Sequence, residues 1–94
     1  MEKKYVYVIV EEGSWGYEFT NSLEVYDNFQ KAKKDFEQRV KNTKTDMANW
    51  LEEDETEIEE TKDLENEHLY FSMYENGDYT RLHNSIRLNK MEVK

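Results

Sequence analysis

Apolar and polar residues alternate along residues 4–10, near the start of the chain. Alternation over a short run rich in β-branched and aromatic residues predicts a strand. Successive side chains of a strand point to opposite faces, and we expect the valine face of this run to pack on the core. The valine face holds Val6, Val8 and Val10, and the opposite face holds Tyr5, Tyr7 and Ile9.

A turn and a second strand are expected next. Gly13 and Gly16 lie within residues 12–16, and glycine adopts the positive φ angles of tight turns without steric cost. Residues 17–26 are again rich in strand-forming side chains, with an irregularity near Asn21. The short connection favours antiparallel pairing of this strand with the first.

The clearest helix begins at Asp27. Asp27 supplies an N-cap acceptor, and Gln30 follows three residues later, as in a capping box. Apolar residues then recur at spacings of three and four, which predicts an amphipathic helix of about six turns. The stripe consists of Phe29, Ala32, Phe36, Val40, Thr43, Met47 and Trp50.

Residues 52–67, the acidic segment, follow neither period. Ile58 and Leu64 are its only apolar residues, and ten of its residues carry carboxylates. Mutual repulsion of these carboxylates disfavours tight packing. The segment could form an extension of the helix, a short edge strand around residues 57–62 or a mobile loop. We expect the helix to end and a loop to follow, with the edge strand as the alternative.

Alternation returns at residues 68–74. Asn76-Gly77 follows, which is the strongest short signal for a two-residue hairpin turn. This turn would pair Phe71 with Leu82, and one face of the hairpin would be apolar while the other is rich in tyrosine. The apolar face holds Leu69, Phe71, Met73 and Leu82, and the other holds His68, Tyr70, Tyr74, Tyr79, Arg81 and His83.

The predicted order is strand, strand, helix, strand, strand. We expect an α+β fold in which an antiparallel sheet of about four strands carries the long helix on one face. The last strand continues through Leu88, and Met91 and Val93 would form a short strand after a bend. Residues 1–94 form a single domain, because the chain is too short for a second core. The predicted core holds Val6, Val8, Val10, Phe29, Phe36, Val40, Phe71, Met73 and Leu82.

The net charge of −9 comes from one part of the chain. The acidic segment holds ten of the 22 acidic and one of the 13 basic residues, so the remainder is balanced with twelve of each. A chain with this charge repels polyanions unless a basic patch compensates. We therefore expect no direct contact with nucleic acid.

Cysteine is absent, which excludes disulfides and cysteine-ligated metals. The apolar run at residues 5–10 is too short for the core of a signal peptide or for a membrane span. These observations lead us to expect a cytoplasmic protein without membrane contact.

No motif for catalysis, cofactor binding or metal binding stands out. His68 and His83 share a face of the predicted hairpin, but a metal site needs three or four ligands and no third is evident. Residues 54–59 lack the glycine and the closing glutamate of a calcium loop. No serine lies in a Gly-x-Ser-x-Gly turn, and residues 13–16 lack the lysine of a phosphate loop. We expect no enzyme, no cofactor and no metal.

The tyrosine-rich hairpin face has three interpretations. Exposed aromatics on a sheet can stack on single-stranded bases, but such surfaces need basic surroundings and here Arg81 is the one fixed cation expected. Ordinary cross-strand packing of tyrosines is the simplest interpretation. A protein interface, including that of a homodimer, is the next, because tyrosine with arginine is typical of interfaces.

The acidic segment is interpreted either as a solvated loop or as a ligand for a basic surface. In the second case its carboxylates would follow the same steering that phosphates use, as in a protein that mimics nucleic acid. The candidate interaction residues are Glu52, Glu53, Asp54, Glu55, Glu57, Glu59, Glu60, Asp63, Tyr70, Tyr74, Tyr79 and Arg81.

Three stretches resemble small uncharacterised proteins encoded by bacterial phages and other mobile elements. They are the opening Tyr-Val-Tyr-Val-Ile-Val strand, residues 25–27 leading into residues 31–37, and the hairpin at residues 74–79 with His83 and Ile86. The resemblance covers about half of the chain and implies no catalytic residues. It implies a small accessory or inhibitor protein.

We therefore expect a non-enzymatic protein-interaction or inhibitor module. It would bind a protein with a basic surface through the acidic segment and the tyrosine-rich face. The alternative is a self-associating structural domain with no small-molecule chemistry. Either a monomer or a homodimer is compatible with the sequence.

Overall fold

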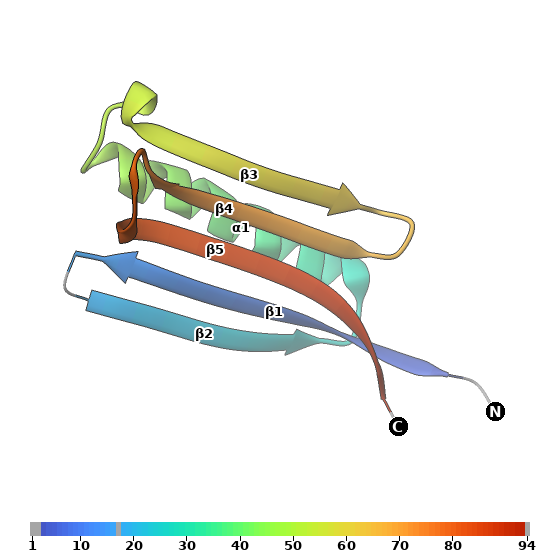
Figure 1. The fold of residues 1–94 in the computed structure, drawn as a ribbon. Helices are drawn as coiled ribbons and strands as arrows, with labels where there is room; N and C mark the ends of the chain where they lie inside the picture. Colours follow the sequence, from blue (N-terminus) through green and yellow to red (C-terminus); the bar gives the residue numbers. More distant parts are fainter. Residues whose placement is uncertain (1–2, 17, 94) are drawn as a thin grey trace.

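The computed structural model describes residues 3–16 and 18–93, and for residues 78–80 it describes the backbone alone. Within these residues, five antiparallel strands form one sheet, and one α-helix lies across one of its faces (Figure 1). The elements are β1 (Lys4–Trp15), β2 (Glu18–Tyr26), α1 (Phe29–Ala48), the short 3-10 helix η1 (Glu53–Glu55), β3 (Thr56–Asp63), β4 (His68–Glu75) and β5 (Asp78–Val93).

The α+β prediction is confirmed, with one strand more than expected. The sheet order is β2-β1-β5-β4-β3, so β5 lies at the centre while β2 and β3 form the edges. The fifth strand, β3, comes from the acidic segment. Its residues Thr56 to Asp63 pair with β4 from Glu75 to His68. The loop that we favoured for this part of the chain is wrong, and the edge-strand alternative is confirmed.

The expectation that the valines of β1 face the core is wrong. Tyr7 and Ile9 are buried between the sheet and α1, and the Tyr7 ring packs against Phe29 at 5.7 Å between centroids. Both faces of β1 are apolar, so alternation alone could not decide which face the helix covers. The valines are half-buried on the other face.

Helix α1 begins one residue later than expected. Asn28, not Asp27, is the N-cap, and its side chain accepts a hydrogen bond from the Lys31 backbone N–H at 3.2 Å. The predicted apolar stripe is confirmed up to Met47. Trp50 lies beyond the helix end, after the C-cap residue Asn49, and is 65% exposed.

The hairpin turn at Asn76-Gly77 is confirmed, but the predicted register is wrong beyond the pair Glu75 and Asp78 next to the turn. A bulge beside Tyr74 and Glu75 shifts the pairing, so that Phe71 lies opposite Ile86 instead of Leu82. The shift is an even number of residues, so the predicted faces are retained. Met91 and Val93 belong to β5 itself rather than to a separate short strand, because β5 pairs with β1 along that strand's whole length. The buried core comprises Tyr7, Ile9, Ala32, Phe36, Met47, Leu69, Phe71, Met73, Leu82, Ile86 and Leu88.

Candidate functional site on the open face of the sheet

The open face is the side of the sheet away from α1, and no other element of the described chain covers it (Figure 1). The strand register arranges its side chains in rows that run from edge to edge. The central row consists of Leu23, Val10, Arg87, Tyr70 and Thr61, one from each strand. This face changes from apolar at the β2 edge to acidic at the β3 edge.

The apolar half of the open face lies over β2 and β1. Phe19, Leu23 and Val25 on β2 are 82%, 63% and 55% exposed, respectively. Large apolar side chains gathered on a surface are typical of interaction sites rather than of solvated sheets. The apolar half is defined as Val6, Val8, Val10, Phe19, Leu23, Val25 and Met91.

The acidic half lies over β3 and β4 and is defined as Glu57, Glu59, Tyr70 and Tyr74. Glu57 lies opposite Tyr74 and Glu59 opposite Ser72, so both carboxylates are on the open face. The Tyr74 hydroxyl donates to Glu59 Oε1 at 3.1 Å. Hydrogen bonding to the Glu57 and Glu59 carboxylates raises the pKa of Tyr74 to about 12. The phenol therefore stays neutral and holds the Glu59 carboxylate through this hydrogen bond.

An arginine that the sequence analysis missed lies between the two halves. The Arg87 guanidinium lies over the Tyr70 ring at 5.7 Å from its centroid, a cation–π arrangement. Arg81, the cation we expected on this face, has its Nε 2.8 Å from Glu75 Oε2. The sequence contained a signal for Arg87, because Arg81, His83 and Arg87 share one parity along the strand.

The structure divides the candidate interaction residues into groups. Only Glu57, Glu59, Tyr70 and Tyr74 are brought together in the acidic half. Glu60 points to the helix side of β3, where it borders a groove with Lys41 and Lys44 of α1. The side chain of Tyr79 lies outside the described residues. Four further candidates lie in or beside η1, before the start of β3: Glu52, Glu53, Asp54 and Glu55.

Asp63 has a structural role at the end of β3. Its carboxylate accepts hydrogen bonds from the Asn66 backbone N–H at 3.1 Å and from the Asn66 side chain at 2.8 Å. These bonds lower the pKa of Asp63 below its ordinary value. Asp63 therefore holds the turn between β3 and β4 and is less free to contact a partner.

A shallow hollow of about 330 Å³ lies on the open face near the turn between β1 and β2, with Ser14 and His83 in its lining. Burial lowers the pKa of His83, and the nearby Glu12 carboxylate opposes that effect. Ser14 is only 4% exposed, and its hydroxyl donates to the Arg81 carbonyl at 3.4 Å. A serine turned inward in this way does not present a nucleophile to a substrate.

The two histidines are far apart. His68 pairs with Asp63 and His83 with Tyr74, at opposite ends of β4. Six strand residues separate these positions, which corresponds to roughly 20 Å. Among the described residues, no three His, Asp or Glu side chains form a group that could hold a metal ion. Nor does this part of the chain contain a helix that is long and apolar enough to cross a membrane.

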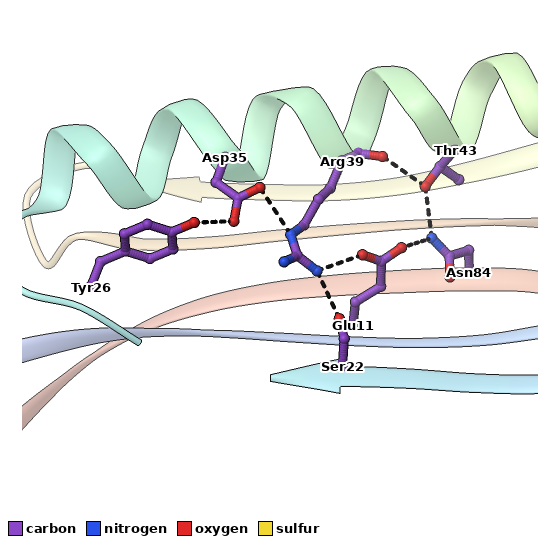
Figure 2. Close-up of polar contacts among 7 residues, drawn as sticks. All are labelled: Glu11, Ser22, Tyr26, Asp35, Arg39, Thr43 and Asn84. Carbon is purple, nitrogen blue, oxygen red and sulfur yellow. Dashed lines mark hydrogen bonds and ion pairs between the residues drawn. The ribbon is translucent and has the colours of Figure 1, made fainter. Parts of the chain in front are cut away.

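A polar network joins α1 to the other face of the sheet (Figure 2). Arg39 of α1 donates to Asp35 at 3.1 Å, to Glu11 of β1 at 2.8 Å and to Ser22 of β2 at 2.8 Å. Burial alone lowers the pKa of Arg39, but the hydrogen bonds to Asp35 and Glu11 outweigh it and raise that pKa. Asn84 of β5 extends the network, and the contacts hold the helix against three strands.

Comparison with models of protein families, with curated proteins and with solved structures found no match.

Proposed function

We propose that this protein is a non-enzymatic interaction module that binds a basic surface of another protein through the acidic half of its open sheet face. The observation that carries the proposal is the pair of carboxylates, Glu57 and Glu59, ordered beside Tyr74 on a face that α1 leaves uncovered. Two carboxylates on alternate strand residues lie about 7 Å apart, on a rigid element rather than a loop.

Electrostatics favour a basic partner. The net charge is −9, and the edge strand β3 carries three glutamates within eight residues. Such a surface increases the association rate with a positive patch and repels acidic proteins. A specific form of the proposal is an inhibitor whose carboxylates occupy a groove that otherwise receives nucleic-acid phosphates.

Aromatic side chains supply the contact area beside the charges. Tyr70 and Tyr74 are half-buried next to the carboxylates, and Arg87 lies over Tyr70. Tyrosine and arginine are enriched where protein interfaces gain most of their binding energy. Tyrosines of the hairpin face and glutamates of the acidic segment, which we considered as separate candidates from the sequence, are therefore neighbours on one surface.

The test uses two variants with the same change in net charge. Glu57→Gln/Glu59→Gln removes the carboxylates from the open face, while Glu53→Gln/Glu65→Gln removes two from η1 and the β3–β4 turn. Both keep side chains that accept hydrogen bonds, so circular dichroism should show an unchanged fold. The tagged variants are used to capture proteins from the source cell at low and high salt.

The proposal predicts a partner that wild type and the control variant retain at low salt, and that Glu57→Gln/Glu59→Gln loses. If both variants retain the same proteins as wild type, or if only the control variant loses them, the acidic half of the open face is not the binding surface.

A further inference from the structure

The two edges of the sheet differ in how they resist pairing with another strand. In the described chain, β2 pairs with β1 alone and β3 with β4 alone, so each edge exposes unpaired backbone N–H and C=O groups. Proteins commonly protect such edges with charges, proline or bulges. Strand β3 is protected by its glutamates. Strand β2 has neither Pro nor Lys, its two glutamates are Glu18 and Glu24 towards its ends, and its nine residues are nearly all exposed.

We propose that the β2 edge pairs antiparallel with β2 of a second copy of this chain, which joins two five-stranded sheets into one of ten strands. The register that uses all nine residues of Glu18–Tyr26 places Ser22 on the two-fold axis. Phe19 then lies opposite Val25 of the second copy, and Thr20 lies opposite its Glu24. An apolar pair and a neutral–acidic pair therefore form twice in each dimer.

The alternative registers of β2 are poorer. Residues opposite each other in an antiparallel pair share a face. A slip of one residue would therefore place the two helices on opposite sides of the joined sheet, so the registers that keep both helices on one side are two residues apart. One such shift places Glu18 opposite Glu24 of the second copy, and like charges directly opposite each other are destabilising. The other shift leaves Glu18 and Phe19 without partners. The full-length register is therefore the self-complementary one.

Strand β3 cannot pair with β3 of a second copy in the same way. The two registers that keep both helices on one side and pair most of its residues place either Glu59 or Glu60 opposite the same residue of the second copy, and these like charges repel. Self-association of this chain is thus directed to the β2 edge. This asymmetry is what identifies a second copy as the occupant of that edge.

In the joined sheet, apolar surfaces meet at the junction and the acidic edges lie far apart. The apolar halves of the two open faces meet in the middle, where Phe19 lies opposite Val25 of the other copy. Leu23 lies opposite Asn21 of the other copy, with the Phe19 and Leu23 of that copy on its diagonals. The two β3 strands lie at the outer edges, about nine strand spacings or roughly 43 Å apart. That separation is several Debye lengths at physiological salt, so the acidic edges do not oppose the dimer. Both acidic halves remain accessible in the dimer, so dimerisation is a property separate from the proposed binding of a basic partner.

Sedimentation equilibrium on charge variants tests the pairing. We expect a concentration-dependent dimer of the wild-type chain. Thr20→Glu should weaken it by roughly tenfold, because two Glu–Glu pairs form in each dimer, while Thr20→Lys should strengthen it. Thr61 is an exposed threonine on the other edge strand, so Thr61→Glu and Thr61→Lys make the same charge changes as matched controls. The control variants should dimerise as wild type does.

A cysteine crosslink tests the register. The chain contains no cysteine, so Ser22→Cys introduces one thiol on the two-fold axis, and Thr61→Cys is its control. With a mild oxidant, Ser22→Cys should crosslink rapidly at concentrations where the dimer forms, and Thr61→Cys should not. Equal crosslinking of both variants would overturn the register.

A wild-type chain that stays monomeric at several hundred micromolar would overturn the dimer, as would a dimer that responds equally to the Thr20 and Thr61 substitutions. Failure here is distinguishable from failure of the proposed function. Thr20→Glu should leave partner capture unchanged, and Glu57→Gln/Glu59→Gln should leave dimerisation unchanged.

Discussion

Asn84 of β5 donates a hydrogen bond to Thr43 of α1, with 2.7 Å between Nδ2 and Oγ1, and both residues are 2% exposed. The same amide donates to Glu11 at 2.8 Å, and the Thr43 hydroxyl donates to the Arg39 carbonyl at 2.9 Å. A buried chain of hydrogen bonds therefore links the middle of the helix to the central strands, as Figure 2 shows. Such a link fixes how the helix sits on the sheet, and hence which face stays open.

Asn84→Ala should destabilise the fold. The substitution removes the donor to both Thr43 and Glu11, so the buried Thr43 hydroxyl and the partly buried Glu11 carboxylate lose a partner. We expect the free energy of unfolding to fall by about 2–3 kcal/mol. Urea unfolding measures this, with Asn89→Ala on the same strand as the control, because Asn89 is half-buried on the open face. Equal losses for the two variants would contradict a structural role for the buried link.

Arg39→Lys should be almost as damaging as Arg39→Met. The guanidinium side chain is 16% exposed and donates in several directions, to Asp35, Glu11 and Ser22. A lysine ammonium cannot reproduce this planar fork. We expect both substitutions to reduce the free energy of unfolding by about 2 kcal/mol, since two partly buried carboxylates lose their partner. Wild-type stability of Arg39→Lys in urea unfolding would show that charge alone is sufficient.

Gly13→Ala should be more destabilising than Gly16→Ala. A Cβ at Gly13 would lie 2.5 Å from Asn84 Oδ1 and 2.8 Å from Trp15 Nε1, so buried groups must move. We expect a loss of about 1–3 kcal/mol from this overpacking. Gly16 has open space around its Cβ position and a φ of 72°, so alanine there costs about 1 kcal/mol through backbone strain alone. Comparison of thermal midpoints gives the order of the two effects.

His83 should make the fold less stable as the pH falls. Burial places the pKa of folded His83 below its ordinary value of 6.5, whereas the unfolded chain keeps that value. As the pH falls through 6.5, the unfolded state takes up a proton before the folded state does, so the free energy of unfolding decreases. We expect this loss between about pH 7 and pH 5.5 to be smaller in His83→Gln. Identical pH dependence of the two proteins in urea unfolding would contradict the assignment.

The helix and the hairpin turn could be predicted because their signals are local. The stripe from Phe29 to Met47 follows the helical period, and Asn76-Gly77 specifies a tight turn whatever surrounds it. The choice of face for β1 could not be predicted in this way. Val8 and Ile9 are equally apolar, and only the packing of α1 determines which of them is buried.

The acidic strand shows a different limit. The repulsion among Glu57, Glu59 and Glu60 argued for a loop. In the structure, however, β4 supplies hydrogen-bond partners for one edge of the β3 backbone, and the exposed glutamate side chains are screened by solvent. The role of Asn84 also lacked a sequence signal. A single asparagine on an apolar strand face gives no indication that Thr43 and Glu11, distant in sequence, are its partners.

The proposed binding of a basic protein by the acidic half of the open face is tested by the dissociation constant of the captured partner, measured by titration calorimetry across a range of salt concentrations. We expect Glu57→Gln/Glu59→Gln to bind more weakly than wild type at low salt, with a shallower salt dependence, and the two dissociation constants to converge at high salt. Equal affinities and equal salt dependence for wild type and this variant would contradict it.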